Sequence, residues 1–135
     1  MSEVMWDVHD NIILSYQVDF ENETLIIKTL YDDNKIREKI DVIFTGYLTH
    51  IFENEMKDNI ILSIDESSCD RFIEDEQEFL IKQKNNWWPI KYETQNDLSD
   101  YLQDNCYKAY IIYASLGLSG WVLAKNTDFV KQTNK

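Results

Sequence analysis

The chain has 135 residues, 44% of them hydrophobic, and carries 25 acidic against 13 basic side chains, a formal net charge of −12. A chain of this length fits one domain with its own core, so we expect a single domain over residues 1–135. The negative field repels nucleic-acid phosphates and anionic lipid headgroups, which disfavours nucleic acid and membrane as partners. A basic protein is the partner that the charge favours, beside a role in solubility alone.

The composition also bounds the compartment. Residues 1–7 lack the basic and apolar regions of a signal peptide, and no apolar run approaches the ~18 residues that cross a bilayer. We therefore expect a cytoplasmic protein. Free buried thiols are expected for Cys69 and Cys106, with a disulfide as the alternative.

Alternating polar and apolar residues predict a β-meander in the first third of the chain. The first strand places apolar side chains on one face: Ile12, Leu14, Tyr16, Val18 and Phe20. Polar turns at 21–23 and 32–34 separate it from a second strand over 25–30 and a third over 36–44.

The middle of the chain shows both helical and strand-like patterns of apolar residues. The spacing of Leu48, Ile51, Phe52 and Glu55 predicts a short helix within 46–54, and the apolar run 60–64 predicts a fourth strand. From Ser67 the period becomes helical, which predicts one longer helix from about Ser68 to Lys84 with Ser67 or Ser68 as its N-cap. A mobile acidic loop is the alternative, because its composition is similar.

The last third adds a helix and two strands. Thr94, Gln95 or Asn96 is expected to cap a helix that ends at Asn105. Two strands follow, over 107–114 and 120–124, joined by a loop containing Gly117.

These elements predict an α+β fold, with an antiparallel sheet of about six strands and one longer and one or two shorter helices packed on one face. Trp6 and Trp121 are expected in the core or at its edge. The residues predicted to fill the core are Leu14, Tyr16, Val18, Ile27, Ile40, Val42, Phe44, Ile61, Phe72, Leu80, Leu102, Ile111 and Val122.

One segment concentrates the negative charge. Its acids, opposed by the single base Arg71, are Asp65, Glu66, Asp70, Glu74, Asp75, Glu76 and Glu78. This fourteen-residue run has a net charge of −6, half that of the chain. It is either a solvated helix face or an electrostatic docking surface for a cationic protein. Calcium binding is disfavoured because the run has neither the spacing nor the glycine of an EF-hand loop.

Trp87 and Trp88 stand before Pro89 as the most conspicuous aromatic group. An exposed tryptophan would anchor a protein interface, whereas a buried one would close the core where a helix returns to the sheet. We expect at least one of the two to be buried.

Catalytic motifs are missing. The chain contains no Gly-x-Ser-x-Gly elbow and no phosphate-binding glycine loop. His9 beside Asp10 can serve as a base or a metal ligand, but a two-histidine metal site would require His50 to meet it in space. We therefore expect no catalytic residues, no metal and no cofactor.

The layout resembles small uncharacterised acidic proteins of Bacillus-type bacteria, some of them grouped with immunity proteins that neutralise toxins. The resemblance rests on His9-Asp10 before a strand pair, on Val42-Ile43-Phe44-Thr45-Gly46, and on Gly117-Leu118-Ser119-Gly120-Trp121. It implies an acidic protein that acts by binding, and it transfers no site residues.

The leading hypothesis is therefore a non-catalytic, protein-binding domain, in its most specific form an immunity-like inhibitor of a basic toxin. The acidic run would meet lysines and arginines of the toxin, with Trp87 or Trp88 as an apolar anchor. The alternatives are a small metal-dependent enzyme using His9 and Asp10, and a structural assembly subunit. The oligomeric state stays open.

Overall fold

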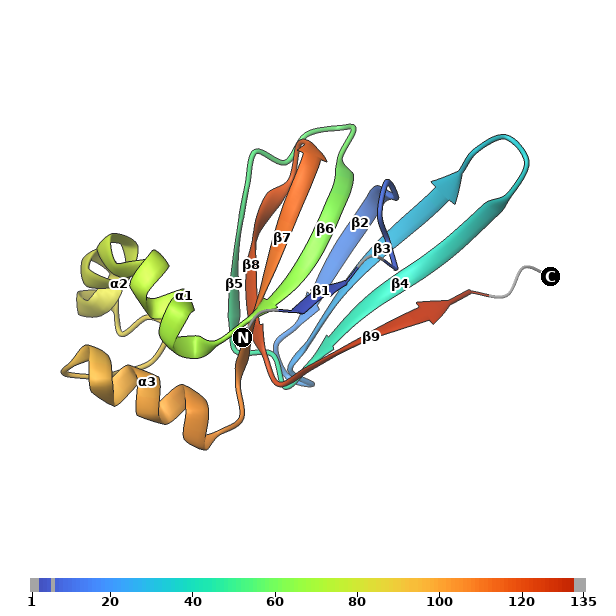
Figure 1. The fold of residues 1–135 in the computed structure, drawn as a ribbon. Coiled ribbons are helices and arrows are strands. Elements are labelled where there is room, and N and C mark those ends of the chain that lie inside the picture. Colours follow the sequence, from blue (N-terminus) through green and yellow to red (C-terminus); the bar gives the residue numbers. More distant parts are fainter. Residues whose placement is uncertain (1–2, 6, 133–135) are drawn as a thin grey trace.

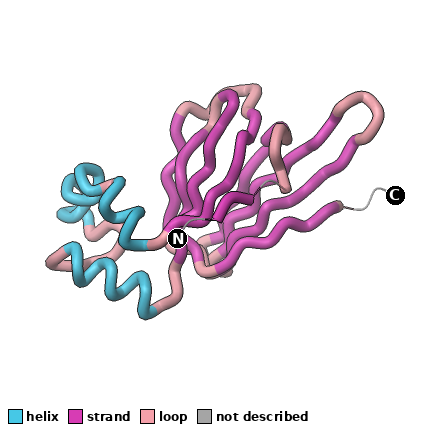
Figure 2. Tube along the Cα trace, in the orientation of Figure 1, coloured by secondary structure: helices cyan, strands magenta, loops and turns pink. Residues whose placement is uncertain are grey.

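The computed structural model describes residues 3–5 and 7–132, and strands dominate it. The strands are β1 (Glu3–Met5), β2 (Ile12–Asp19), β3 (Thr24–Asp32), β4 (Arg37–Thr45), β5 (Thr49–Glu53), β6 (Ile60–Ser67), β7 (Lys108–Leu116), β8 (Ser119–Ala124) and β9 (Asn126–Lys131). The helices are α1 (Cys69–Asp75), α2 (Gln77–Gln83), the 3-10 turn η1 (Lys84–Asn86) and α3 (Gln95–Asp104). The three α-helices lie together at one side of the strands (Figures 1 and 2).

The strands form one antiparallel sheet in the order β5-β8-β7-β6-β2-β3-β4-β9, and β1 pairs with β6 off this path. The α+β class and the β2–β3–β4 meander agree with the sequence prediction. The predicted number of about six strands is wrong, because eight described strands lie along the path and β1 is an additional one. The short β1 and the two end strands, β5 and β9, are the ones that the sequence pattern did not reveal.

The helix predicted within 46–54 is instead strand β5, which pairs with β8 from Thr49 opposite Leu123 to Glu53 opposite Ser119. Both faces of β5 meet apolar side chains: Ile51 packs against the helical layer, and Phe52 packs against the opposite core. Apolar residues on both faces remove the two-residue alternation of a half-buried strand. Without that alternation, the spacing of the apolar residues in this segment also fits a helix, which is why the sequence predicted one.

A β-bulge in β2 changes which side chains face the core. Ile13 pairs with Thr29 and Ser15 with Lys28, so Leu14 is an extra residue without a position opposite it. The bulge turns Ile13 inward and leaves Leu14 49% exposed, so the prediction of Leu14 as a core residue is wrong. Phe20, predicted on the same face, lies beyond the end of the strand and is 76% exposed.

The sheet curls strongly. Phe44 on β4 and Tyr110 on β7 have ring centroids 5.3 Å apart, although three strands separate β4 from β7 in the sheet order. Across a flat sheet the two strands would lie roughly 19 Å apart, at about 4.8 Å per strand. Lys125 alone connects β8 to β9, and its backbone N–H donates to the carbonyl of Thr45 over 3.0 Å. The strands therefore meet at this end and spread apart toward the other (Figure 2).

Curling gives the molecule two cores. The first fills the inside of the curled sheet, and the second lies between the helices and the outer face of β7, β8 and β5. Among the residues predicted for the core, Tyr16, Val18, Ile40 and Ile111 are half-buried against these clusters. The others apart from Leu14 are buried: Ile27, Val42, Phe44, Ile61, Phe72, Leu80, Leu102 and Val122.

Three further sequence expectations have outcomes here. Trp121 is buried, as predicted, whereas Trp6 lies outside the described residues. Both cysteines are free thiols, but the expected burial holds only for Cys69, since Cys106 lies exposed in the turn between α3 and β7. None of the helices in residues 7–132 has the length and apolar character required to cross a bilayer.

Candidate functional site

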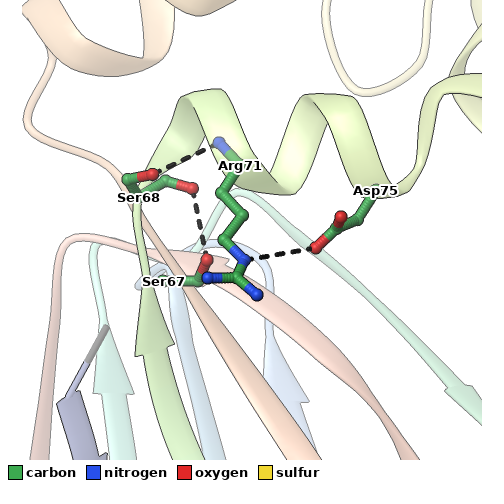
Figure 3. Close-up of polar contacts among 4 residues, drawn as sticks. All are labelled: Ser67, Ser68, Arg71 and Asp75. Atoms are coloured by element: carbon green, nitrogen blue, oxygen red, sulfur yellow. Dashed lines mark hydrogen bonds and ion pairs between the residues drawn. The ribbon is translucent and has the colours of Figure 1, made fainter. Parts of the chain in front are cut away.

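Within the acidic run, Asp65 to Glu78, strand β6 gives way to helix α1, and Ser68 is the N-cap of that helix. The Ser68 hydroxyl accepts a hydrogen bond from the backbone N–H of Arg71, so of the two predicted caps, Ser67 and Ser68, the structure uses Ser68 (Figure 3). The side chain of Arg71 then reaches along the helix, and its Nε lies 3.8 Å from Oδ2 of Asp75. Both side chains are about two-thirds exposed, so this ion pair leaves the carboxylate of Asp75 accessible to a partner.

The segment predicted as one helix is divided at Glu76, where α1 ends and α2 begins. The indole Nε1 of Trp121 donates a 2.8 Å hydrogen bond to Oε1 of Glu76. Trp121 lies on β8 and is 5% exposed, so its N–H needs an acceptor inside the protein. Glu76 supplies that acceptor, so its carboxylate has a structural role in the fold.

Asp70 also has an internal role. Its Oδ1 accepts hydrogen bonds from the hydroxyl of Ser99 and, over 3.1 Å, from Nε2 of Gln103. Both donors lie on α3, so Asp70 fastens α1 to α3.

The first two acids of the run lie on β6 rather than on a helix. Asp65 accepts from the hydroxyl of Ser63 over 3.2 Å, and Oε1 of Glu66 lies 3.7 Å from Nζ of Lys108 on β7. Both are half-buried between β1 and β7. The structure therefore does not place Asp65 and Glu66 on the surface formed by the later acids.

Three of the predicted acids remain exposed around one hollow. Glu74, Asp75 and Glu78 line a depression of about 450 Å³ at the junction of α1 and α2. Glu76, Gln77, Phe79 and Lys82 complete its walls. We call Glu74, Asp75 and Glu78 the acidic rim.

The two adjacent tryptophans have different environments, but neither is fully buried, so the expectation that at least one is buried is met only in part, by Trp88. Trp88 is half-buried in the helical core, where its ring centroid lies 5.5 Å from that of Trp121 and 5.2 Å from that of Phe79. Its Nε1 donates a 3.0 Å hydrogen bond to the hydroxyl of Thr49 on β5. Trp88 thus joins the helical layer to the sheet and is not available as an anchor.

Trp87 is 66% exposed and adopts a left-handed backbone conformation with φ of 57° at the end of η1. It borders a second hollow, of about 560 Å³, between η1 and α3. Nζ of Lys91 lies 5.0 Å from its ring centroid, and Tyr92 and Tyr101 line the same space. The sequence analysis did not predict this hollow, and its only signal was the aromatic density of residues 87–92.

The two histidines do not form a common site in the described part of the chain. His9 hydrogen-bonds the carbonyl of Leu62 over 2.8 Å, whereas His50 lies 2.7 Å from the hydroxyl of Tyr47 inside the curled sheet. Burial lowers the pKa of His50, which favours its neutral form. Within residues 7–132, no three side chains of His, Cys, Asp or Glu are grouped so that they would hold a metal ion.

Comparisons with known proteins bear on the fold. A crystal structure of an uncharacterised protein from Neisseria gonorrhoeae resembles this chain with a TM-score of 0.51, covering 96% of each chain at 11% sequence identity. At that identity the likeness shows a shared fold and nothing further. No family profile and no curated protein matches the sequence.

Proposed function

We propose that this protein is a non-catalytic binding domain whose acidic rim docks onto a basic protein, most specifically as an immunity-like inhibitor of a basic toxin. One observation carries the proposal: Glu74, Asp75 and Glu78 are exposed around a single hollow, while Asp70 and Glu76 accept hydrogen bonds from side chains of α3 and β8.

The exposure of the rim suits electrostatic docking. Of the three carboxylates, Asp75 has an ion-pair partner, the exposed Arg71 at 3.8 Å. Exposed carboxylates attract a cationic surface over distances near the Debye length of about 8 Å, and that attraction raises the association rate and orients the encounter.

Trp87 supplies apolar contact area at the end of η1. It follows Glu78 by nine residues through α2 and η1, on the order of 15 Å along the helical axis. A standard interface spans about 800 Å² on each partner, which is wide enough to include both the rim and Trp87. Tryptophan is enriched among the residues that contribute most to binding free energy.

The test compares two triple charge reversals. The rim variant carries Glu74→Lys, Asp75→Lys and Glu78→Lys, and the control carries Glu21→Lys, Glu53→Lys and Asp58→Lys at exposed positions away from the helices. Both change the net charge by the same amount, so a difference between them reports the location of the charge. The partner assayed is the purified product of the gene directly upstream.

We expect the rim variant to bind with an association rate constant at least about tenfold lower at low salt, with a flatter dependence on ionic strength. The control is expected to stay within about threefold of the unmodified protein. Equal association rates for the rim variant and the control, measured by surface plasmon resonance, would remove the rim from the proposed interface.

A further inference from the structure

Two free thiols border one hollow at the base of the helical layer. Cys69 is the first residue of α1, and Cys106 lies in the turn between α3 and β7. The hollow between these segments has a volume of about 450 Å³, and both cysteines line it together with Gln103 and Lys108.

A hydrogen bond draws Cys69 close to the backbone at Cys106. The Sγ of Cys69 donates to the carbonyl oxygen of Tyr107 over 3.0 Å, and Tyr107 directly follows Cys106 in the chain. The two thiols nevertheless differ in access to solvent, because Cys69 is 5% exposed and Cys106 is an exposed residue.

We propose that Cys106 and Cys69 form a redox-active pair that a small-molecule disulfide, such as oxidised glutathione, converts into an intramolecular disulfide. In the first step the Cys106 thiolate attacks one sulfur of the oxidant, which forms a mixed disulfide and releases one small thiol. In the second step the Cys69 thiolate attacks the sulfur of Cys106, which expels the second small thiol. The protein loses two protons and two electrons, and the oxidant is reduced to two thiols.

The order of the steps follows from exposure. Cys106 is the thiol that an oxidant in solution can reach. Cys69, whose Sγ lies 3.0 Å from the carbonyl oxygen of the next residue, Tyr107, can then attack the Cys106 sulfur within the same molecule at high effective concentration. Burial raises the pKa of the Cys69 thiol to about 11, so little of it is thiolate at neutral pH. The second step is therefore slow at neutral pH and accelerates as the pH rises, by about tenfold per pH unit below that pKa.

The bond would change the helical layer. It would join the start of α1 to the α3–β7 turn and so restrict the motion of both helices relative to the sheet. This inference does not depend on the binding function, because its chemistry requires the two cysteines alone.

The experiment uses the unmodified protein with oxidised glutathione at about pH 7 and about pH 9, followed by intact mass and peptide mapping after acid quenching. We expect a transient species heavier by one glutathione at Cys106. It should convert into a species lighter than the starting protein by two hydrogens, with Cys69 and Cys106 linked in one peptide pair. The conversion should be on the order of a hundredfold faster at the higher pH.

Two variants identify the roles of the thiols. In Cys69→Ser the glutathione adduct at Cys106 should persist, and in Cys106→Ser no adduct should form on the folded protein. A stable adduct on the unmodified protein at both pH values, dimers linked through Cys106, or no reaction at all would each overturn the proposal, whether or not the variants fold.

Discussion

At the scale of single residues, neighbouring acids in the same run do different things. Glu76 accepts a hydrogen bond from the buried indole of Trp121, while Glu78, two positions further on, is exposed at the hollow. Their side-chain chemistry is the same, so the difference comes from the strand β8 that lies beneath α1 and α2. A carboxylate that satisfies a buried donor stabilises the fold, whereas an exposed one is available to a partner.

The first prediction concerns the hydrogen bond between Glu76 and Trp121. Glu76→Ala leaves the buried indole N–H without an acceptor, which we expect to lower the free energy of unfolding by about 1–3 kcal/mol in urea titrations. Glu76→Gln keeps an acceptor oxygen and is expected to lose less. Glu78→Ala serves as the matched control and should change stability by no more than about 0.5 kcal/mol. Equal losses for Glu76→Ala and Glu78→Ala would contradict the structural role of Glu76.

At the scale of elements, α3 was predictable because its signals are local. Thr94 accepts a hydrogen bond from the backbone N–H of Asp97, and the carboxylate of Asp97 accepts one from the backbone N–H of Thr94. This capping box is encoded in four consecutive residues, so no distant part of the chain is required to form it. The edge strand β5 is the opposite case, since its pairing with β8 joins segments about seventy residues apart.

The second prediction concerns this cap. Thr94→Ala removes the acceptor for the N–H of Asp97, and we expect a loss of about 1 kcal/mol in the free energy of unfolding, with reduced helical signal in circular dichroism. Asn96→Ala is the control, because Asn96 is exposed in the first turn of the same helix and alanine favours a helix. A Thr94→Ala protein as stable as the Asn96→Ala protein would argue against the capping box.

At the scale of the whole molecule, the curl of the sheet decides which residues meet. Phe44 and Tyr110 touch only because β4 and β7 approach each other across the inside of the curled sheet. The same curl leaves the outer face of β7, β8 and β5 to the helices, which carry the acidic rim and Trp87. The same curl therefore brings the strands together near Lys125 and determines where the candidate site lies.

A double-mutant cycle tests the curl. Phe44→Leu and Tyr110→Leu should each destabilise the protein, and the pair should show a coupling of about 0.5–1.5 kcal/mol in urea unfolding. Phe44→Leu combined with Leu98→Ala, whose side chain lies in the other core, should be additive within about 0.5 kcal/mol. A Phe44–Tyr110 coupling no larger than that of this control pair would mean that the two rings do not meet.

Much of the fold could be predicted from local patterns, while the candidate site depended on tertiary contacts. Residue type and period alone indicated the α+β class, the β2–β3–β4 meander, caps within 67–68 and 94–96, and the concentration of acids between Asp65 and Glu78. Each of these follows from alternation, helical spacing or a hydrogen bond within a few residues.

The tertiary structure decided which members of the acidic run are free, because Asp70 and Glu76 meet donors on α3 and β8 that no local pattern reveals. It likewise left Trp88 half-buried in the helical core and Trp87 exposed, and it brought the Cys69 thiol to the carbonyl of Tyr107, next to Cys106. The physical reason is common to all of these cases. The environment of a side chain is set by segments distant in the chain, and here the curl of the sheet determines where those segments come together.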